Sequence, residues 1–286
     1  MTTPSAIVPA VATAWRVTVA PGSGTANCLA EFPEPLGCVM TAEAVPPLQV
    51  LAETSLTPSG SGQPDGKSLV FVFVPAGSEF GVYEEWFKRG IPADGSIPVL
   101  DVALPDRILW RPGRAVMFGS AERRDEILKA LAVFSYLESE VRDLESGVQR
   151  HWGFARQDAA LTHRVGGKSL NEWPRVCEIT EWAALSRLKF SAVDATLYMP
   201  PSVIGPKGRR MLLELARLTR MPDRLEFVDD QIQVFEELYR QANDRLSDYR
   251  YYRRELQLEA AIIILLVMQA IVMVVEIVKG LPPQVP

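Results

Sequence analysis

The chain has 286 residues, of which 48% are hydrophobic and 23% are charged, as is typical of folded proteins with about two domains. This composition excludes wholesale disorder, collagen and a small disulfide-stapled scaffold. The net charge of −5 gives no basic field of the kind that nucleic-acid-binding proteins carry, so no direct nucleic-acid partner is expected. Three cysteines and two histidines leave little material for metal or thiol chemistry.

The first part of the chain is rich in residues that break helices. Fourteen of the 22 prolines and ten of the 19 glycines lie in residues 1–112, which indicates loops and short strands. Residues 1–66 form a loop-rich start and lack the pattern of a secretory signal or mitochondrial presequence. Residues 67–115 form the remainder of a small mixed α+β domain, with a secure strand at Ser68–Val74 and a short helix at Gly81–Arg89. Weaker strands are predicted in both parts of this domain, at Trp15–Val19, Leu48–Leu51, Ile97–Val102 and Ile108–Trp110.

The strip Pro58–Ser68 (PSGSGQPDGKS) ends in a Gly-Lys-Ser triplet like that of a phosphate-binding loop. That motif requires a glycine where this chain has Ser61, and it follows a strand, whereas here the strand comes after the strip. The strip is therefore interpreted as a turn or flexible loop, and no nucleotide site is expected.

Residues 116–221 read as a helical region. Ser120 is a candidate N-cap, and apolar residues then recur at alternating spacings of three and four, which predicts a helix that packs against another helix. This first stripe consists of Ile127, Ala130, Phe134, Leu137, Val141, Leu144 and Val148. Further helices are predicted over Asn171–Leu188 and Arg209–Arg220, separated by Pro200-Pro201 and Gly205–Gly208.

A single very long helix is predicted from Asp223 to Lys279, which is about 85 Å at 1.5 Å per residue. Residues 222–256 carry a second stripe with the same spacing, and its members form the predicted helix seam: Leu225, Val228, Ile232, Phe235, Tyr239, Ala242 and Leu246. The stripe continues to Leu256 and has more apolar positions than the helix Ile127–Val148 can cover. The surplus predicts a contact with another copy of the chain or with a different protein.

Residues 257–279 are predicted to cross a membrane. Ala260–Val278 contains only two polar residues, Gln269 and Glu276, and its length of about 28 Å nearly matches the hydrocarbon core of a bilayer. A buried helix of a soluble protein is the alternative. An aromatic and basic collar precedes the run and favours a membrane interface; it consists of Tyr249, Arg250, Tyr251, Tyr252, Arg253 and Arg254.

The charges around the span predict its orientation. Arg245, Arg250, Arg253 and Arg254 precede it, and only Lys279 follows it, so the positive-inside rule places the bulk of the protein in the bacterial cytoplasm, or in the matrix of an organelle. Residues 280–286 then form a short tail, and the protein is tail-anchored. The cysteines of such a compartment are expected to be thiols.

Few other residues suggest a site. Glu259, Gln269 and Glu276 lie within or beside the span, where polar groups are costly unless paired. Gln269 and Glu276 share a helix face and could hydrogen-bond between neighbouring spans; alternatively, Glu259 and Glu276 mark the two interfaces. The loop Gly205–Arg210 could bind an anion through its backbone N–H groups and the cations Lys207, Arg209 and Arg210, or be a solvated basic loop. His151 and His163 are interpreted as ordinary interface or surface histidines and Cys177 as a buried small hydrophobic residue, and no catalytic, metal or cofactor residue is predicted.

Two segments resemble the C-terminal end of the required-for-meiotic-nuclear-division family: RLEFVDDQIQVFEELYRQANDRL (Arg224–Leu246) and LEAAIIILLVMQ (Leu258–Gln269). In that family the last span begins with Leu-Glu, as at Leu258-Glu259, and carries a second Glu where this chain has Gln269. Similarity extends to RDEILKALAVFSYLESEV (Arg124–Val141) and ATLYMPPSVI (Ala195–Ile204) without the family's tryptophan after the proline, and so covers about residues 105–279. The resemblance implies an oligomeric membrane-anchored protein without established catalysis, whose mitochondrial relatives support translation at the inner membrane.

These observations predict a non-enzymatic, tail-anchored scaffold. It would bind the lipid bilayer, assemble as a homo-oligomer and present its cytoplasmic or matrix domain to a protein or ribonucleoprotein partner, in a role linked to translation at the membrane. The alternative is a membrane-anchored enzyme or effector with a site in the N-terminal α+β domain. An ion channel would need more polar residues along each span than one Gln and one Glu.

Overall fold

The structure is a computed structural model, and it describes residues 12–21, 28–32, 38–52, 68–78, 81–89, 91, 98–103 and 105–280. The chain divides into two compact units. Unit 1 comprises residues 1–150 and 185–232, and unit 2 comprises residues 151–184 and 233–286. The α+β class is confirmed. The predicted linear order of a domain at 67–115 and a helical region at 116–221 differs from this division, because helical segments pack on the sheet within unit 1.

Unit 1 is built on a seven-stranded sheet in the order β2-β3-β1-β4-β7-β6-β5. The strands are β1 (Thr13–Pro21), β2 (Cys28–Phe32), β3 (Cys38–Val45), β4 (Ser68–Pro75), β5 (Leu100–Ala103), β6 (Arg107–Arg111) and β7 (Arg114–Gly119). The central pair β4 and β7 is parallel, and the other pairs are antiparallel. The turn between β6 and β7 contains Gly113 at φ 78°, a conformation that side-chain-bearing residues rarely adopt.

The position of strand β4 in the sheet explains why its sequence is apolar throughout. Leu69, Phe71 and Phe73 belong to the core on one face of the sheet. Val70, Val72 and Val74, which alternate with them, belong to the core on the other face. Both faces of the sheet are therefore covered, and a continuous apolar run is what a strand buried on two sides requires.

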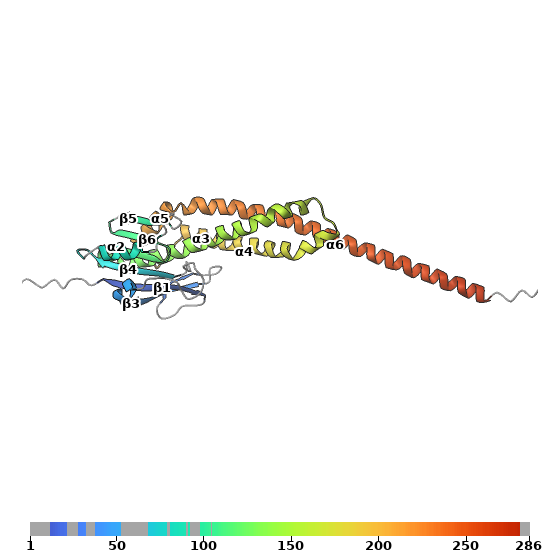
Figure 1. The fold of residues 1–286 in the computed structure, drawn as a ribbon, viewed down its shortest axis with the longest axis horizontal. Coiled ribbons are helices and arrows are strands. Elements are labelled where there is room, and N and C mark those ends of the chain that lie inside the picture. Colours follow the sequence, from blue (N-terminus) through green and yellow to red (C-terminus); the bar gives the residue numbers. More distant parts are fainter. Residues whose placement is uncertain are drawn as a thin grey trace, which may run out of the picture. The chain divides into compact units, whose positions relative to one another are not determined.

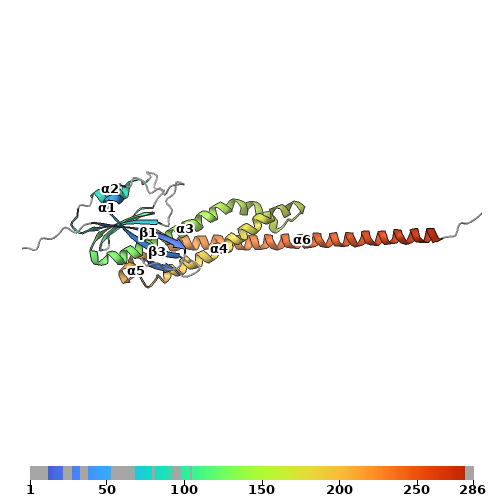
Figure 2. The ribbon, with the colours of Figure 1, turned by 90° about the horizontal axis from the view of Figure 1, so that it is seen from below.

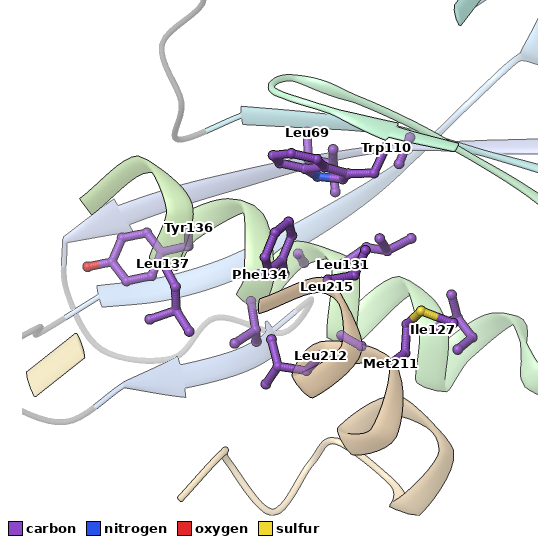
Figure 3. Close-up of a cluster of buried hydrophobic side chains, with 14 of the residues drawn as sticks. Leu69, Trp110, Ile127, Leu131, Phe134, Tyr136, Leu137, Met211, Leu212 and Leu215 are labelled. Atoms are coloured by element: carbon purple, nitrogen blue, oxygen red, sulfur yellow. The ribbon is translucent and has the colours of Figure 1, made fainter. Parts of the chain in front are cut away.

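Helices cover the two faces of this sheet. Figure 2 shows α1 (Pro47–Ala52) and α2 (Gly81–Lys88) on one side, and the start of α3 (Arg124–Asp158) with α5 (Pro206–Leu218) on the other. In the close-up of the second side, Leu69 and Trp110 point toward Phe134 of α3 (Figure 3). The rings of Trp110 and Phe134 meet edge to face at 4.7 Å, and the indole donates a 2.8 Å hydrogen bond to Ser135.

Three helices contribute to both units: α3, α4 (Trp173–Tyr198) and α6 (Met221–Gly280), and Figure 1 shows α6 in orange to red. The 3₁₀ turn Ala121–Arg123 precedes α3, and its N-cap Ser120 accepts a hydrogen bond from the Glu122 amide, as predicted. The first stripe is buried at every position from Ile127 to Val148. Two more 3₁₀ turns, Ala159–Thr162 and Gly167–Glu172, lie between α3 and α4 in unit 2.

Several predictions of local structure are wrong. Leu48–Leu51 lies in helix α1 and not in a strand. Strands β2, β3 and β7 were not predicted, and β7 occupies the residues just before Ser120. The helix predicted from Arg209 begins earlier, at Pro206, since proline fits the first turn of a helix. The strip with the Gly-Lys-Ser triplet lies outside the described residues, except for Ser68 in β4.

Candidate membrane-binding site

The C-terminal part of α6 is an apolar helix that nothing in its unit covers. Every residue from Arg250 to Val274 is exposed, and the large apolar side chains from Leu256 to Val274 are each between 45% and 66% exposed. In the described part of the chain, α6 is the one helix long and apolar enough to cross a membrane, and none of its apolar window is buried. So large an apolar surface requires a lipid or protein environment.

The apolar surface surrounds this helix. Ile262, Ile263, Ile264 and Leu265 follow one another at about 100° intervals and are all exposed. A helix that lies along a membrane surface has one apolar face and one polar face, whereas this segment is apolar on all sides. The geometry therefore fits a helix that crosses the bilayer.

The predicted collar begins where α6 meets the 3₁₀ turn Gly167–Glu172 and the start of α4 in its own unit. The Arg250 guanidinium sits 5.7 Å from the centre of the Trp173 ring, and Tyr249 is half-buried beside Gly167. Tyr251, Tyr252, Arg253 and Arg254 are exposed. Arg254 precedes Ala260 by about 9 Å along the helix, within reach of a headgroup layer. The part played by Trp173 was not predicted, because only contact in space connects it with the collar.

An aromatic cluster holds α6 within unit 2. The Phe235 ring lies edge-on to Trp152 of α3 at 5.6 Å and to Trp182 of α4 at 5.2 Å. Tyr239 stacks with Phe235 at 6.2 Å, one turn farther along α6. His151 lies 4.4 Å from Trp182 and is buried. These contacts join all three helices of the unit.

Beside this cluster lies a buried polar group. Tyr239 donates a 2.9 Å hydrogen bond to Asp158, which is 2% exposed. Arg175 binds the same carboxylate through both Nε and Nη2 and also pairs with Glu172 at 3.0 Å. Burial, and then the bond to Asp158, raises the pKa of the Tyr239 hydroxyl. The hydrogen bond to Asp158 likewise raises the pKa of Arg175.

Unit 1 has a corresponding ionic group on α3 and α6. Arg224 donates 2.8 Å hydrogen bonds to both Glu138 and Glu145, and Glu138 also accepts one from Arg142. Glu138 is 2% exposed. The hydrogen bond that Arg224 donates to Glu145 is the largest influence that raises the pKa of Arg224, against an opposing effect of burial. This group fixes the start of α6 against α3.

The predicted helix seam is buried throughout. Leu225, Val228 and Ile232 lie in unit 1, and Phe235, Tyr239, Ala242 and Leu246 in unit 2, and each is at most 2% exposed. The inference that part of this stripe is left uncovered within the chain is therefore wrong up to Leu246, because α4 packs on α6 in addition to α3. Beyond the seam Tyr249 is half-buried, and Arg253 and Leu256 are exposed.

The predicted anion loop holds an anion from the same chain. Glu126 of α3 accepts a 3.1 Å hydrogen bond from the backbone amide of Lys207, in the first turn of α5. A Cβ atom on Gly205 would lie 2.3 Å from the Glu126 carboxylate, so the loop closes tightly on this side chain. The Lys207, Arg209 and Arg210 side chains are exposed. The backbone position inferred for an external anion is thus occupied by Glu126.

The remaining predicted residues are placed as follows. Glu259 and Gln269 are exposed on α6, whereas Glu276 lies in this helix but its side chain is outside the described residues. Cys177 is exposed on α4, so its prediction as a buried residue is wrong. His163 is exposed. Among the described residues, no three His, Cys, Asp or Glu side chains gather in a way that could hold a metal ion.

No protein-family model and no curated protein matches the chain. The similarity to the required-for-meiotic-nuclear-division family therefore rests on the segments quoted above and stays a prediction.

Proposed function

We propose that the protein is a membrane-anchored, oligomeric scaffold that presents its sheet-containing domain to a macromolecular partner. The observation that carries this proposal is the C-terminal part of α6, apolar on every side and uncovered within its unit. The same helix is held firmly upstream by the seam and by two buried polar groups. A helix with one end packed in a protein bundle and the other end suited to lipid is a firm anchor.

A scaffold role is also supported by how the buried charges are used. Each buried charged side chain in the described part of the chain contacts another group of its own unit. Asp106 accepts a bond from Arg123, Arg111 and Arg114 donate to backbone carbonyls at the end of α2, Glu138 and Asp158 bind arginines, and Glu140 binds Lys189. These contacts stabilise the fold, and they involve the kind of buried charged side chain that enzymes use in active sites.

The resemblance to the required-for-meiotic-nuclear-division family suggests the kind of partner. If the chain shares the role of its mitochondrial relatives, the partner is a protein or ribonucleoprotein of the translation machinery at the membrane. The arginines before the span support a location of the bulk of the protein in the cytoplasm, or in the matrix of an organelle.

The anchor is tested by washing membranes that contain the full chain with alkaline carbonate. The full chain is expected to stay in the pellet, and a chain ending at Arg254 is expected to be released, because it lacks the apolar segment. A chain ending at Lys279 is the matched control and stays in the pellet. Release of the full chain by carbonate would overturn the proposal.

The scaffold role is tested by extraction in mild detergent followed by a mass measurement. A species larger than one chain is expected. A monodisperse monomer that carries one bound small molecule per chain would overturn the scaffold proposal and favour the membrane-anchored enzyme or effector considered above.

A further inference from the structure

Gln269 lies at the centre of the apolar segment. Ala260–Val278 has 19 residues, and Gln269 is the tenth, so about 13 Å of helix separates it from either end. Its side chain is exposed, and its helical neighbours Leu265, Leu266, Val272 and Met273 are apolar. In a bilayer its carboxamide is therefore surrounded by hydrocarbon and lies too deep to reach the headgroups.

A carboxamide has two N–H donors and one carbonyl acceptor, and hydrocarbon satisfies none of them. The described part of this chain contains no second helix that could cross the membrane and supply a partner. Among the described residues, no other helix can therefore offer Gln269 a hydrogen bond at this depth, which leaves another molecule in the bilayer as the source of the partner.

We propose that this partner is Gln269 of a second copy of the chain. All copies insert in one orientation, so residue 269 lies at the same depth in each of them. A carboxamide is also its own complement, since each one can donate to and accept from the other, whereas two carboxylates at this position would repel each other.

The buried seam strengthens this assignment. Because Leu225–Leu246 is covered within the chain, its apolar stripe offers no surface to another copy. Phe227 and Val234 are exposed on α6 within the seam range, but the continuous exposed apolar surface of the helix begins after the seam and runs through the span. The contact between copies is therefore centred on Gln269, with Ile262, Leu265, Leu266, Val272 and Met273 packing on the same helix face.

This inference rests on the proposed membrane anchor and is tested separately from it. Full-length protein labelled with a donor or an acceptor dye is reconstituted in phosphatidylcholine vesicles, and energy transfer is followed as the lipid-to-protein ratio rises. Gln269→Leu is expected to raise the dissociation constant of the oligomer about 3- to 30-fold, the range that interhelical hydrogen bonds of polar side chains give in membranes. Gln257 is an exposed glutamine on the same helix that precedes the apolar segment Ala260–Val278, so Gln257→Leu is the matched control and is expected to associate like the original chain.

A crosslinking experiment tests the geometry. In chains whose natural cysteines are replaced by serine, the single substitutions Leu266→Cys and Met273→Cys lie on the face of Gln269 and are expected to form disulfides between copies. Ile264→Cys and Ile271→Cys lie on the opposite face and are expected to remain unpaired.

The outcomes separate the two proposals. If Gln269→Leu associates like the original chain, or if all four cysteines crosslink equally, the pairing of Gln269 is wrong and the anchor is unaffected. If the original chain resists carbonate but shows no energy transfer at any ratio, the pairing and the oligomeric part of the scaffold proposal are both wrong. Release by carbonate would instead refute the anchor itself.

Discussion

Tyr239 of α6 donates a 2.9 Å hydrogen bond to Asp158, the last residue of α3, which lies 81 residues earlier in the chain. Asp158 is 2% exposed and also binds Arg175 of α4. One buried carboxylate thus connects all three helices of unit 2. A hydroxyl that donates to a buried carboxylate holds its proton, because ionisation would place two negative charges side by side.

We predict that Tyr239 stays protonated at a pH where a free tyrosine ionises. The pKa of Tyr239 is raised above the value of about 10 of a free tyrosine. Its contribution to stability is therefore complete below pH about 10 and is lost as the pH rises above this value, since the unfolded chain then releases a proton that the folded chain retains. Phenolate absorbance during an alkaline titration in detergent measures the number of ionised tyrosines.

The matched variants are Tyr239→Phe and Tyr251→Phe. Tyr251 is 71% exposed, and Tyr251→Phe is the control for the loss of one phenol. Tyr239→Phe should remove only a phenolate that forms when the protein unfolds in alkali. If Tyr239→Phe instead removes a phenolate that forms while the protein is still folded, Tyr239 is accessible to solvent in the folded protein.

A second prediction concerns the ionic group of unit 1. Arg224→Met removes two of the hydrogen-bonded pairs of α6 with α3 and leaves the buried Glu138 with Arg142 as its cationic partner. We expect the free energy of unfolding to fall by about 2–3 kcal/mol, because a buried carboxylate that loses a partner retains its desolvation cost. Urea unfolding in detergent, followed by circular dichroism, measures the change.

Arg240→Met is the control for this variant. Arg240 lies on the same helix and also pairs with a glutamate, Glu237, at 2.8 Å, but both side chains are more than half exposed. Exposed ion pairs contribute little to stability, so no measurable change is expected. If both substitutions lower the free energy of unfolding equally, the burial of Glu138 does not make its ion pair more stabilising than an exposed one.

The sequence predicted the parts of the fold whose residues show a regular pattern. The α3 stripe and the α6 seam repeat every three or four residues over many turns, and their burial was predicted at each position from Ile127 to Val148 and from Leu225 to Leu246. Strand β4 was predicted because its run of valine and phenylalanine is flanked by glycine and proline. Such patterns arise directly from burial on one helix face or on two sheet faces.

The wrong predictions occur where the sequence pattern is short, or where the structure depends on a contact between residues far apart in the sequence. The run Leu48–Leu51 is too short to distinguish a helix from a strand by periodicity, and it forms a helix with Val50 buried and Leu48 exposed. Strand β3 mixes buried Met40 with exposed Glu43, and its place beside β1 depends on pairing over a long sequence distance. The partners of Arg224, Tyr239 and Glu126 all lie about 80 residues away, so no local pattern could identify them.

A third prediction tests the seam. Ile232→Asp or Phe235→Asp places a charge at a position that is 0% exposed, at a cost of several kcal/mol in a packed interior. We expect the helical content to fall and the melting temperature to drop sharply, as measured by circular dichroism in detergent. Val234→Asp is the control, since Val234 lies on the same helix and is 51% exposed. If all three variants melt like the original chain, the seam is not a packed interior.

The last prediction concerns the side of the membrane on which the bulk of the protein lies. Arg245, Arg250, Arg253 and Arg254 precede the span, and Lys279 follows it, so we expect Cys177 to face the cytoplasm. Cys177 is exposed on α4 and should react readily with a membrane-impermeant maleimide in a chain that carries Cys28→Ser and Cys38→Ser. Inverted membrane vesicles should be labelled and intact spheroplasts should not. Gln284→Cys, placed after the span in a chain with Cys177→Ser as well, should give the reverse result. Because the two cysteines lie on opposite sides of the apolar segment, labelling of both from one side would contradict the crossing of the membrane, and exchange of the two results would contradict only its orientation.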